Sequence, residues 1–252
     1  MNYIVKKVFY LVLFIFVVVT NGHSKKIANI PEASGICFID KTKSIVVVND
    51  EGWIYKLTTN GKIVQKKYLG KYDLEGITYD KKNDRLLVVV EGEESILIVQ
   101  RGSLQIVKEI KIKRSYQKVK ILKKSKKTGI EAIAIDNDGE IYVSNQSKKT
   151  YNKKLKENIS VILKVTSLDN KKTKIKEVFN HGYIDIAGMT FHNGYLYMTS
   201  DKKNLLIKYD IKNNKTIAKI KLPKSAQEGI CFDNKNNIYI ADDNGAILRY
   251  KK

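Results

Sequence analysis

Beyond residue 24 the chain alternates short apolar runs with polar turns, and this alternation predicts β-strands throughout. The first set of runs reads GICFI, SIVVVND, GWIYKLT and KIVQKKYLG, and the next reads GITYD, RLLVVVE, SILIVQ and LQIVKEIKI. The runs are rich in β-branched and aromatic residues, while Asp, Asn, Gly and Lys fill the turns between them. No long stretch has the period of about 3.6 residues that marks a helix. We therefore expect an all-β protein.

A motif with an acidic residue within three positions of a glycine recurs at the start of one predicted strand in each set of four. The copies read EASGICFI, DLEGITYD, GIEAIAID, DIAGMTFH and AQEGICFD. Their spacings are 41, 56, 56 and 41 residues when they are aligned on Gly35, Gly76, Ala132, Gly188 and Gly229. Four strands per period of about 40 to 50 residues are typical of a β-propeller blade. The longer spacings contain insertions from Lys113 and from Ser147, which we expect to be surface loops on the face of the acidic motif.

The two ends of the chain together complete the fifth repeat. After Gly229 this repeat supplies only three strands before the chain ends at Lys252. The early stretch KIANIPEASG matches TIAKIKLPKSAQEG, the fourth strand of repeat four with the start of repeat five. We therefore expect residues 25–30 to form the outer strand of the last blade and to cover its open edge. The predicted fold over residues 25–252 is a five-bladed β-propeller closed by an N-terminal strand.

Residues 1–24 have the pattern of an export signal. Lysines precede an apolar stretch from Val8 to Val19, and small residues follow it. The stretch is shorter than the roughly 20 apolar residues of a membrane-spanning helix. A cleaved signal peptide is therefore favoured over an N-terminal membrane anchor. Both predict an exported protein, periplasmic or otherwise extracytoplasmic, which an uncleaved segment would tether to the inner membrane.

The net charge of +21 raises the question of a polyanionic partner. Nearly all of the positive charge is lysine, which lacks the planar fork with which arginine binds phosphate. We therefore expect no specific nucleic acid partner. General attraction to an anionic small molecule or to the envelope surface is the expected consequence of this charge.

Motifs of several other chemistries are missing from the chain. There is no G-x-S-x-G elbow, Walker A loop, H-E-x-x-H helix or dinucleotide fingerprint. Cys37 and Cys231 stand at equivalent positions of the first and last repeats, where we expect free buried thiols, with a disulfide as the alternative. Neither a catalytic nucleophile nor a zinc site is indicated.

The repeated acidic residues are expected to converge at one mouth of the central channel. The first strand of each blade lines the channel, so the position before each repeat glycine recurs around the mouth. Further polar residues are expected there, two residues before these positions and at the ends of the second strands: Glu32, Asp73, Asp185, Asn49, Asp50, Glu91, Asn145, Asp201, Asp242 and Asp243. Two bare carboxylates about 6 Å apart repel by about 3 kcal/mol at an effective dielectric constant near 20. Oxygen ligands without thiolates or clustered histidines suit Ca²⁺. The candidate metal ligands are Glu75, Glu131, Glu228, Glu91 and Asn145; alternatively, each Glu only accepts hydrogen bonds from the next blade.

The motifs E-x-S-G-I, D-L-E-G-I-x-Y-D, G-I-E-A-I-A and Q-E-G-I-x-F-D resemble those of the SdiA-regulated, YjiK-like family of bacterial β-propellers, distant relatives of NHL-repeat and phytase-like proteins. The resemblance covers residues 25–252. It implies a five-bladed propeller behind an N-terminal hydrophobic segment, with Ca²⁺ as the bound ion and a contribution to calcium homeostasis. By motif, it assigns Glu75 and Glu131 first and Glu228 next. Ala132 and Ala187 depart from the pattern, so the ring is asymmetric.

Three functions are open at this point. The first is an exported calcium-binding propeller with a role in binding, sensing or calcium homeostasis at the cell envelope. The second is a calcium-dependent phosphoesterase or esterase resembling phytase-like propellers, in which the ion polarises an ester oxygen and lysines hold an anionic substrate. The third is a metal-free interaction scaffold. Whether the protein is an enzyme and what its oligomeric state is are left open.

Overall fold

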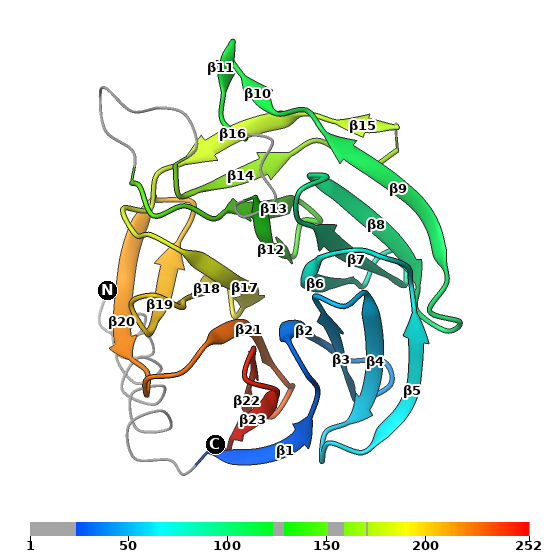
Figure 1. The fold of residues 1–252 in the computed structure, drawn as a ribbon. Coiled ribbons are helices and arrows are strands. Elements are labelled where there is room, and N and C mark those ends of the chain that lie inside the picture. The colour runs from blue at the N-terminus through cyan, green and yellow to red at the C-terminus, as the bar shows by residue number, and fades with distance from the viewer. Residues whose placement is uncertain (1–23, 123–128, 151–158, 170, 252) are drawn as a thin grey trace.

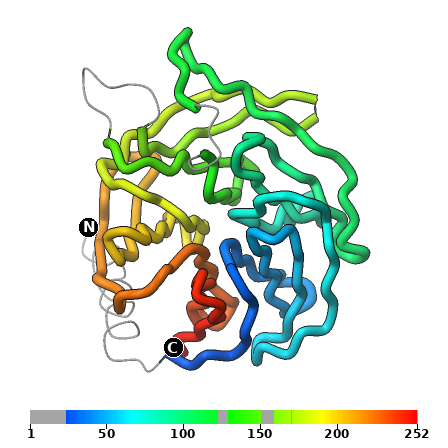
Figure 2. Tube along the Cα trace, in the orientation of Figure 1, coloured from blue at the N-terminus to red at the C-terminus, as the bar shows by residue number. Residues whose placement is uncertain are grey.

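The computed structural model describes residues 24–122, 129–150, 159–169 and 171–251. All regular structure in these ranges is β-strand. Five sheets surround a central channel, and the chain passes round the ring once, as the colours of Figures 1 and 2 show. The prediction of an all-β, five-bladed propeller is confirmed.

Blades 1 to 4 are each built mainly from consecutive strands. Blade 1 contains β2 (Ala33–Ile39), β3 (Ser44–Asn49), β4 (Trp53–Thr58) and β5 (Ile63–Tyr68). Blade 2 contains β6 (Leu74–Asp80), β7 (Arg85–Val90), β8 (Ser95–Gln100) and β9 (Ile106–Ile112). Blade 3 contains β12 (Ile130–Ile135), β13 (Ile141–Asn145), β14 (Val161–Val165) and β16 (Ile175–Phe179). Blade 4 contains β17 (Ile186–His192), β18 (Tyr195–Ser200), β19 (Leu205–Asp210) and β20 (Lys215–Lys221).

The last blade combines the two ends of the chain. Blade 5 contains β21 (Gln227–Phe232), β22 (Ile238–Asp242) and β23 (Ala246–Tyr250), and its outer strand is β1 (Lys25–Asn29). The strands β1 and β23 are antiparallel, with Lys25 opposite Arg249 and Asn29 opposite Ala246. The ring is therefore closed by hydrogen bonds between the chain ends, as the sequence predicts.

The core lies between neighbouring blades, which explains the continuous apolar runs. Every residue of β3 is buried. Val46 and Val48 pack with Leu86 and other residues of blade 2, whereas the alternate residues of β3 pack with Tyr239 and its neighbours in blade 5. A strand covered on both faces is apolar at every position. The outer strands have one face toward solvent and alternate instead.

Both insertions belong to the neighbourhood of blade 3, and the first is more than a surface loop. It contains the hairpin β10 (Ser115–Tyr116) and β11 (Val119–Lys120). Ile121 and Leu122, which follow the hairpin, are buried in the core between blades 2 and 3. The expectation of a plain surface loop is therefore wrong for this part. The segments 123–128 and 151–158 of the two insertions lie outside the described residues.

Two further features bear on the sequence predictions. A short strand, β15 (Lys172–Thr173), adds to the outer edge of blade 2 in parallel with β9, which the four-strand repeat does not predict. The predicted export signal or anchor, residues 1–24, lies outside the described residues except for Ser24. In the described part of the chain, no helix has the length and apolar character needed to cross a bilayer.

Candidate metal centre

The repeated glycines let the inner strands of the blades approach one another closely. Four of them lie against the backbone of the residue at the acidic position of a neighbouring blade. The pairs are Gly35 with Glu75, Gly76 with Glu131, Gly188 with Glu228, and Gly229 with Ser34. A Cβ atom added to these glycines would lie 2.1–2.7 Å from the carbonyl oxygen of the partner, closer than real Cβ contacts allow. Glycine is required there, and the close contact fixes the backbone of the acidic residue.

A β-bulge at the start of each inner strand lies at the acidic position. In all five blades the register with the second strand shifts there, between Ala33 and Gly35, Leu74 and Ile77, Ile130 and Ile133, Ile186 and Gly188, and Gln227 and Gly229. A bulge leaves a residue outside the ladder and redirects its side chain. The sequence indicated the acidic residue and the glycine but not the bulge. Because of the bulge, the direction of the carboxylate does not follow from the normal alternation of side chains along the strand.

Three of the five predicted ligands come together at the mouth of the channel where the inner strands begin; we call this end the acidic mouth. Glu75 and Glu131 begin the inner strands of blades 2 and 3, and Glu91 follows β7. One carboxylate oxygen from each lies within 4.8 Å of the others. At that separation, and at an effective dielectric constant near 20, each ionised pair repels by about 3.5 kcal/mol. Three such pairs would cost about 10 kcal/mol, which is comparable to the whole stability of a domain. The group therefore needs protons or a cation.

Burial and mutual repulsion raise the pKa values of these carboxyl groups. Burial is the main cause for Glu75, followed by the charges of Asp50 and Glu228, and its pKa lies well above the usual value. Burial is also the main cause for Glu131, whose pKa is raised further by Glu75 and Glu91. The pKa of Glu91 is raised as well, again chiefly by burial. Without a cation, the group therefore takes up protons more readily than ordinary glutamates do.

Glu228, the fourth predicted ligand, faces the same mouth without joining this group. Burial, followed by neighbouring aspartates, raises its pKa to about 8. Its charge in turn raises the pKa values of Glu75 and Glu131. Glu228 is therefore electrostatically part of the mouth, although its oxygens are outside the 4.8 Å group.

Asn145, the fifth predicted ligand, has a buried oxygen without a hydrogen-bond partner in the described part of the chain. Its side chain is 1% exposed and lies at the end of β13, where its backbone is opposite Ile130, the residue before Glu131. Its Nδ2 donates to the carbonyl oxygen of Ile159 at 2.7 Å, whereas Oδ1 has no partner. Oε1 of Glu91 is also buried without a partner among the described residues. Buried polar atoms are normally hydrogen-bonded, so these two oxygens remain available to a further ligand.

Asn49, the equivalent asparagine of blade 1, has a hydrogen-bond partner for the oxygen that is unpaired in Asn145. Oδ1 of Asn49 accepts a hydrogen bond of 2.9 Å from the backbone nitrogen of Trp53, which the short β3–β4 turn brings into reach. In blade 3 the second insertion occupies the corresponding connection between β13 and β14. The turn N–H that satisfies Asn49 is therefore not supplied in the same way to Asn145.

A second acidic group shares Glu75 with the first. Asp50, Asp73 and Glu75 each bring a carboxylate oxygen within 4.8 Å of the others. Burial raises the pKa of Asp50 to about 7, although a hydrogen bond from the hydroxyl of Ser34 opposes this shift. The sequence indicated Asp50 and Asp73 near the mouth but gave no reason to choose them as ligands.

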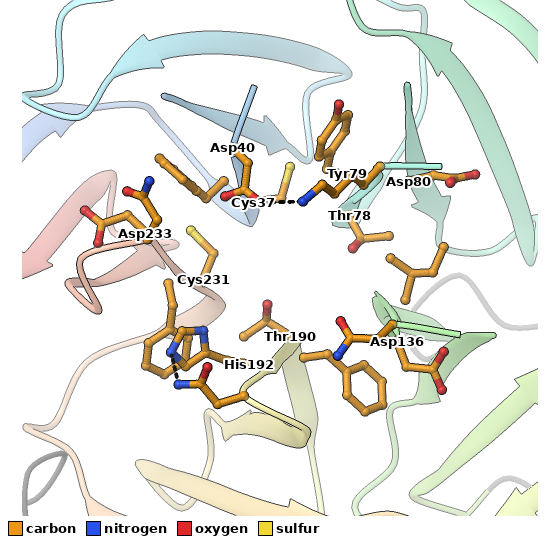
Figure 3. A pocket seen from close by; sticks show the side chains of 18 of the residues that line it. Cys37, Asp40, Thr78, Tyr79, Asp80, Asp136, Thr190, His192, Cys231 and Asp233 are labelled. Atoms are coloured by element: carbon orange, nitrogen blue, oxygen red, sulfur yellow. Dashed lines mark hydrogen bonds and ion pairs between the residues drawn. The ribbon is translucent and has the colours of Figure 1, made fainter. Parts of the chain in front are cut away.

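The opposite mouth of the channel holds a wider cavity that sequence reasoning did not identify. Its volume is about 860 Å³, and residues at the C-terminal ends of the five inner strands line it (Figure 3). Cys37 and Cys231 contribute to its wall as free buried thiols, as the sequence predicts, and Thr78 and Thr190 also point into it (Figure 3). Between the two mouths, glycines and apolar residues of the inner strands narrow the channel to a cavity of about 10 Å³.

Three of the five aspartates beside this wider cavity stabilise the fold locally. They end the runs GITYD, AIAID and GICFD, and they are Asp80, Asp136 and Asp233; the other two are Asp40 and Asp138. Asp136 accepts hydrogen bonds of 2.9–3.0 Å from two backbone nitrogens of its own turn, and Asp233 does the same at 2.9 Å. Asp80 is paired with Arg85 at 2.8 Å. These carboxylates are satisfied within the fold, in contrast to those at the acidic mouth.

Comparison with solved structures shows the same architecture. The Myxococcus xanthus glutaminyl cyclase matches with a TM-score of 0.65 and 13% identity, over 90% of this chain and 92% of that chain. A glucose dehydrogenase matches with a TM-score of 0.59 and 8% identity, over 91% and 99% of the two chains. A luciferin-regenerating enzyme matches with a TM-score of 0.54 and 13% identity, over 87% and 72%. At these identities the similarity concerns the fold alone.

Comparison of the sequence with protein families gives a more specific result. No curated protein matches the chain. The model of the SdiA-regulated family, however, matches residues 17–245. This range contains all five repeated motifs, the closing strand β1 and both acidic groups of the mouth. The match covers most of the chain and agrees with the resemblance found in the motifs, and the chain therefore belongs to the SdiA-regulated family.

Proposed function

We propose that this protein is a calcium-binding propeller whose acidic mouth holds Ca²⁺ through Glu75, Glu91 and Glu131. The observation that carries the proposal is the convergence of these three carboxylates within 4.8 Å. Asn145, whose Oδ1 is buried without a partner among the described residues, lies opposite Ile130, the residue before Glu131. Glu228 contributes negative charge to the same mouth. The ion supplies the positive charge that the group otherwise takes up as protons.

The donor chemistry favours a hard cation. The two acidic groups found in the described residues contain carboxylates only, without a histidine or a cysteine. Ca²⁺ binds six to eight oxygens at about 2.3–2.6 Å and tolerates irregular geometry, whereas Mg²⁺ demands a near-ideal octahedron. Carboxylates, an amide oxygen and water are the kinds of donor that can supply the six to eight oxygens of a Ca²⁺ site. The donor set therefore fits calcium better than zinc or magnesium.

The proposed role is calcium binding or sensing at the cell envelope. Glu75 and Glu91 belong to blade 2, whereas Glu131 and Asn145 belong to blade 3, so the ligands are assembled only when these two blades pack together. An ion bound there joins neighbouring blades and stabilises the folded ring over the open chain. The N-terminal sequence pattern supports an extracytoplasmic location.

A calcium-dependent phosphoesterase or esterase is the alternative function. Similar folds include a glutaminyl cyclase and a luciferin-regenerating enzyme, so this architecture supports catalysis in other proteins. Fold similarity does not transfer an activity, because the same scaffold hosts unrelated functions. Calcium binding is common to both functions and is therefore tested first.

Isothermal titration with CaCl₂ tests the proposal directly. The parent protein is expected to bind calcium, and a Glu75→Gln/Glu131→Gln variant is expected to lose at least about tenfold in affinity, because two charged ligands are gone. An Asp40→Asn/Asp138→Asn variant is the control, since it removes equal charge at the opposite mouth. Equal calcium binding by the parent and the glutamine variant would place the site elsewhere.

A further inference from the structure

The outer strand of blade 1 exposes apolar side chains, unlike most outer strands of the propeller. Among the described residues, the exposed large hydrophobic side chains are Ile63, Val64 and Tyr68 on β5 and Val107 on β9, with exposed fractions of 42, 54, 45 and 67%. On β1, β16 and β20, the exposed positions carry Lys, Asn or Glu. Clustered exposed apolar residues indicate a contact surface. We call Ile63, Val64, Tyr68 and the adjacent Trp53 the β5 surface.

Positive charge surrounds the β5 surface. Residues 52–72 contain five lysines and no acidic residue, and the lysines are Lys56, Lys62, Lys66, Lys67 and Lys71. The ion pairs found in the described part of the chain involve none of these five. Lys66 lies over the ring of Trp53, with Nζ 5.4 Å from the ring centroid, and Trp53 packs against Tyr68 at 5.2 Å. Apolar, aromatic and cationic side chains therefore share one face.

The edge of β5 is poorly suited to pairing with another strand. The register with β4 passes from Lys56 opposite Gln65 to Leu57 opposite Ile63, which leaves Val64 as a bulged residue. Nε2 of Gln65 also donates to the carbonyl oxygen of Gly102 in blade 2, at 3.3 Å. Bulges and lysines on an edge strand oppose strand addition. This surface therefore presents side chains rather than a free backbone ladder, which argues against a second copy of the chain adding a strand here.

The β5 surface lies close to the point where the apolar N-terminal sequence joins the fold. Residues 1–23 lead directly to β1 through Ser24. Gly61, in the turn before β5, packs so closely on β1 that a Cβ atom there would lie 1.8 Å from the carbonyl oxygen of Ile27. Figure 2 shows β1 and β5 following each other along the rim of the ring. The same part of the rim thus carries the N-terminal connection and the exposed apolar residues.

We propose that the β5 surface contacts an anionic lipid bilayer. Tyr and Trp prefer the membrane interface, and exposed aliphatic side chains gain from burial among the lipid chains. Lysines near the surface are attracted by anionic headgroups. Contact through the rim keeps the bilayer away from both ends of the channel, because β5 is an outer strand and the channel is at the centre of the ring. The acidic mouth would remain open to the solution.

The intrinsic fluorescence of the protein tests this proposal, since Trp53 is the single tryptophan of the chain. The full chain is mixed with phosphatidylcholine vesicles, with or without phosphatidylglycerol, that carry brominated lipid near the headgroup. Quenching of Trp53 is expected in the phosphatidylglycerol vesicles and should decrease with added salt. Quenching reports whether the β5 surface itself touches the lipid, whichever other part of the chain contacts the vesicle.

Matched variants distinguish lipid binding by the β5 surface from a general attraction of the positively charged protein to anionic vesicles. Lys62→Glu/Lys67→Glu alters the β5 side of the rim and keeps Lys66 over Trp53, whereas Lys215→Glu/Lys219→Glu makes the same charge change on β20. Each lysine contributes about fivefold to binding, so the first variant should need at least about tenfold more lipid for half-maximal quenching. The β20 variant should resemble the parent. Ile63→Ser/Val64→Ser should also weaken quenching.

Three results would overturn the proposal. The first is the absence of quenching in the parent, and the second is an equal loss of quenching in both lysine variants. The third is dimerisation of the parent in lipid-free solution that Ile63→Ser/Val64→Ser abolishes, as measured by sedimentation, because the surface would then serve a second copy of the chain. None of these results depends on calcium binding at the acidic mouth.

Discussion

Replacement of Glu75 and Glu131 by glutamine is expected to have opposite effects with and without calcium. The change preserves the side-chain size but removes two of three carboxylates whose oxygens lie within 4.8 Å of one another. Each ionised pair costs about 3.5 kcal/mol at an effective dielectric constant near 20, and the parent lowers this cost by holding protons. At pH 8 without metal, the variant should therefore be more stable by about 1–3 kcal/mol. This corresponds to a Tm increase of about 2–12 °C for a domain of this size.

Calcium should reverse the order of stability. The parent gains about 2.7 kcal/mol when free calcium is one hundred times its Kd, because the ion binds the closed ring and not the unfolded chain. The expected increase in Tm is about 5–10 °C. The variant has lost two ligands, so its Tm should hardly change. A merely structural role for the two glutamates predicts instead that the variant is less stable under both conditions.

Thermal unfolding followed by circular dichroism, in chelator or in calcium, measures both effects. The Asp40→Asn/Asp138→Asn variant should keep the calcium-dependent increase, since its changes lie at the opposite mouth. Equal calcium-dependent shifts in the parent and the glutamine variant would refute the assignment of the ligands. A metal-free variant clearly less stable than the parent would refute the argument from charge repulsion.

Two further predictions concern pH and ring closure. In the folded protein the pKa of Glu228 is about 8 and that of Asp50 is about 7, whereas their usual pKa values are 4.5 and 3.8. At a pH between the usual and the raised pKa of each residue, the folded state therefore binds more protons than the unfolded state. The buried His181, whose pKa is lowered to about 4 in the folded protein, opposes this effect below about pH 6.5. The metal-free protein should therefore lose stability as the pH rises from about 6.5 to 8, and saturating calcium should flatten this slope in urea unfolding; an unchanged slope would contradict it. A chain that starts at Pro31 lacks β1 and leaves β23 unpaired, so it should unfold at a lower temperature and aggregate; unchanged stability and solubility would contradict the role of β1.

Much of the fold could be predicted because each blade repeats a local pattern. The strands of blades 1 and 2 follow from apolar runs and turn residues, and the closing strand follows from the match between KIANIPEASG and the strand before repeat five. The same repetition predicts that Glu75 and Glu131 begin inner strands and face one mouth of the channel. These features depend on residues close together in the sequence, or on one residue per repeat.

Other features depend on contacts between distant segments, which a repeat does not specify. The parallel addition of β15 to β9 and the burial of Leu122 result from packing around the insertions. The sequence alone does not distinguish Asn145 from Asn49. The short β3–β4 turn supplies a backbone N–H to Oδ1 of Asn49, whereas Oδ1 of Asn145 has no partner among the described residues.

The sequence by itself determined the class of the fold, the number of blades, the closure of the ring and the type of donor atom at the acidic mouth. Periodicity, turn chemistry and the identity of side chains are sufficient for these conclusions. Only the tertiary structure decided that Glu91 joins Glu75 and Glu131, that Glu228 remains outside their group, and that Asp50 and Asp73 form a second group. The physical reason is that carboxylate separations depend on how closely the glycines let the inner strands approach and on where each bulge directs its side chain.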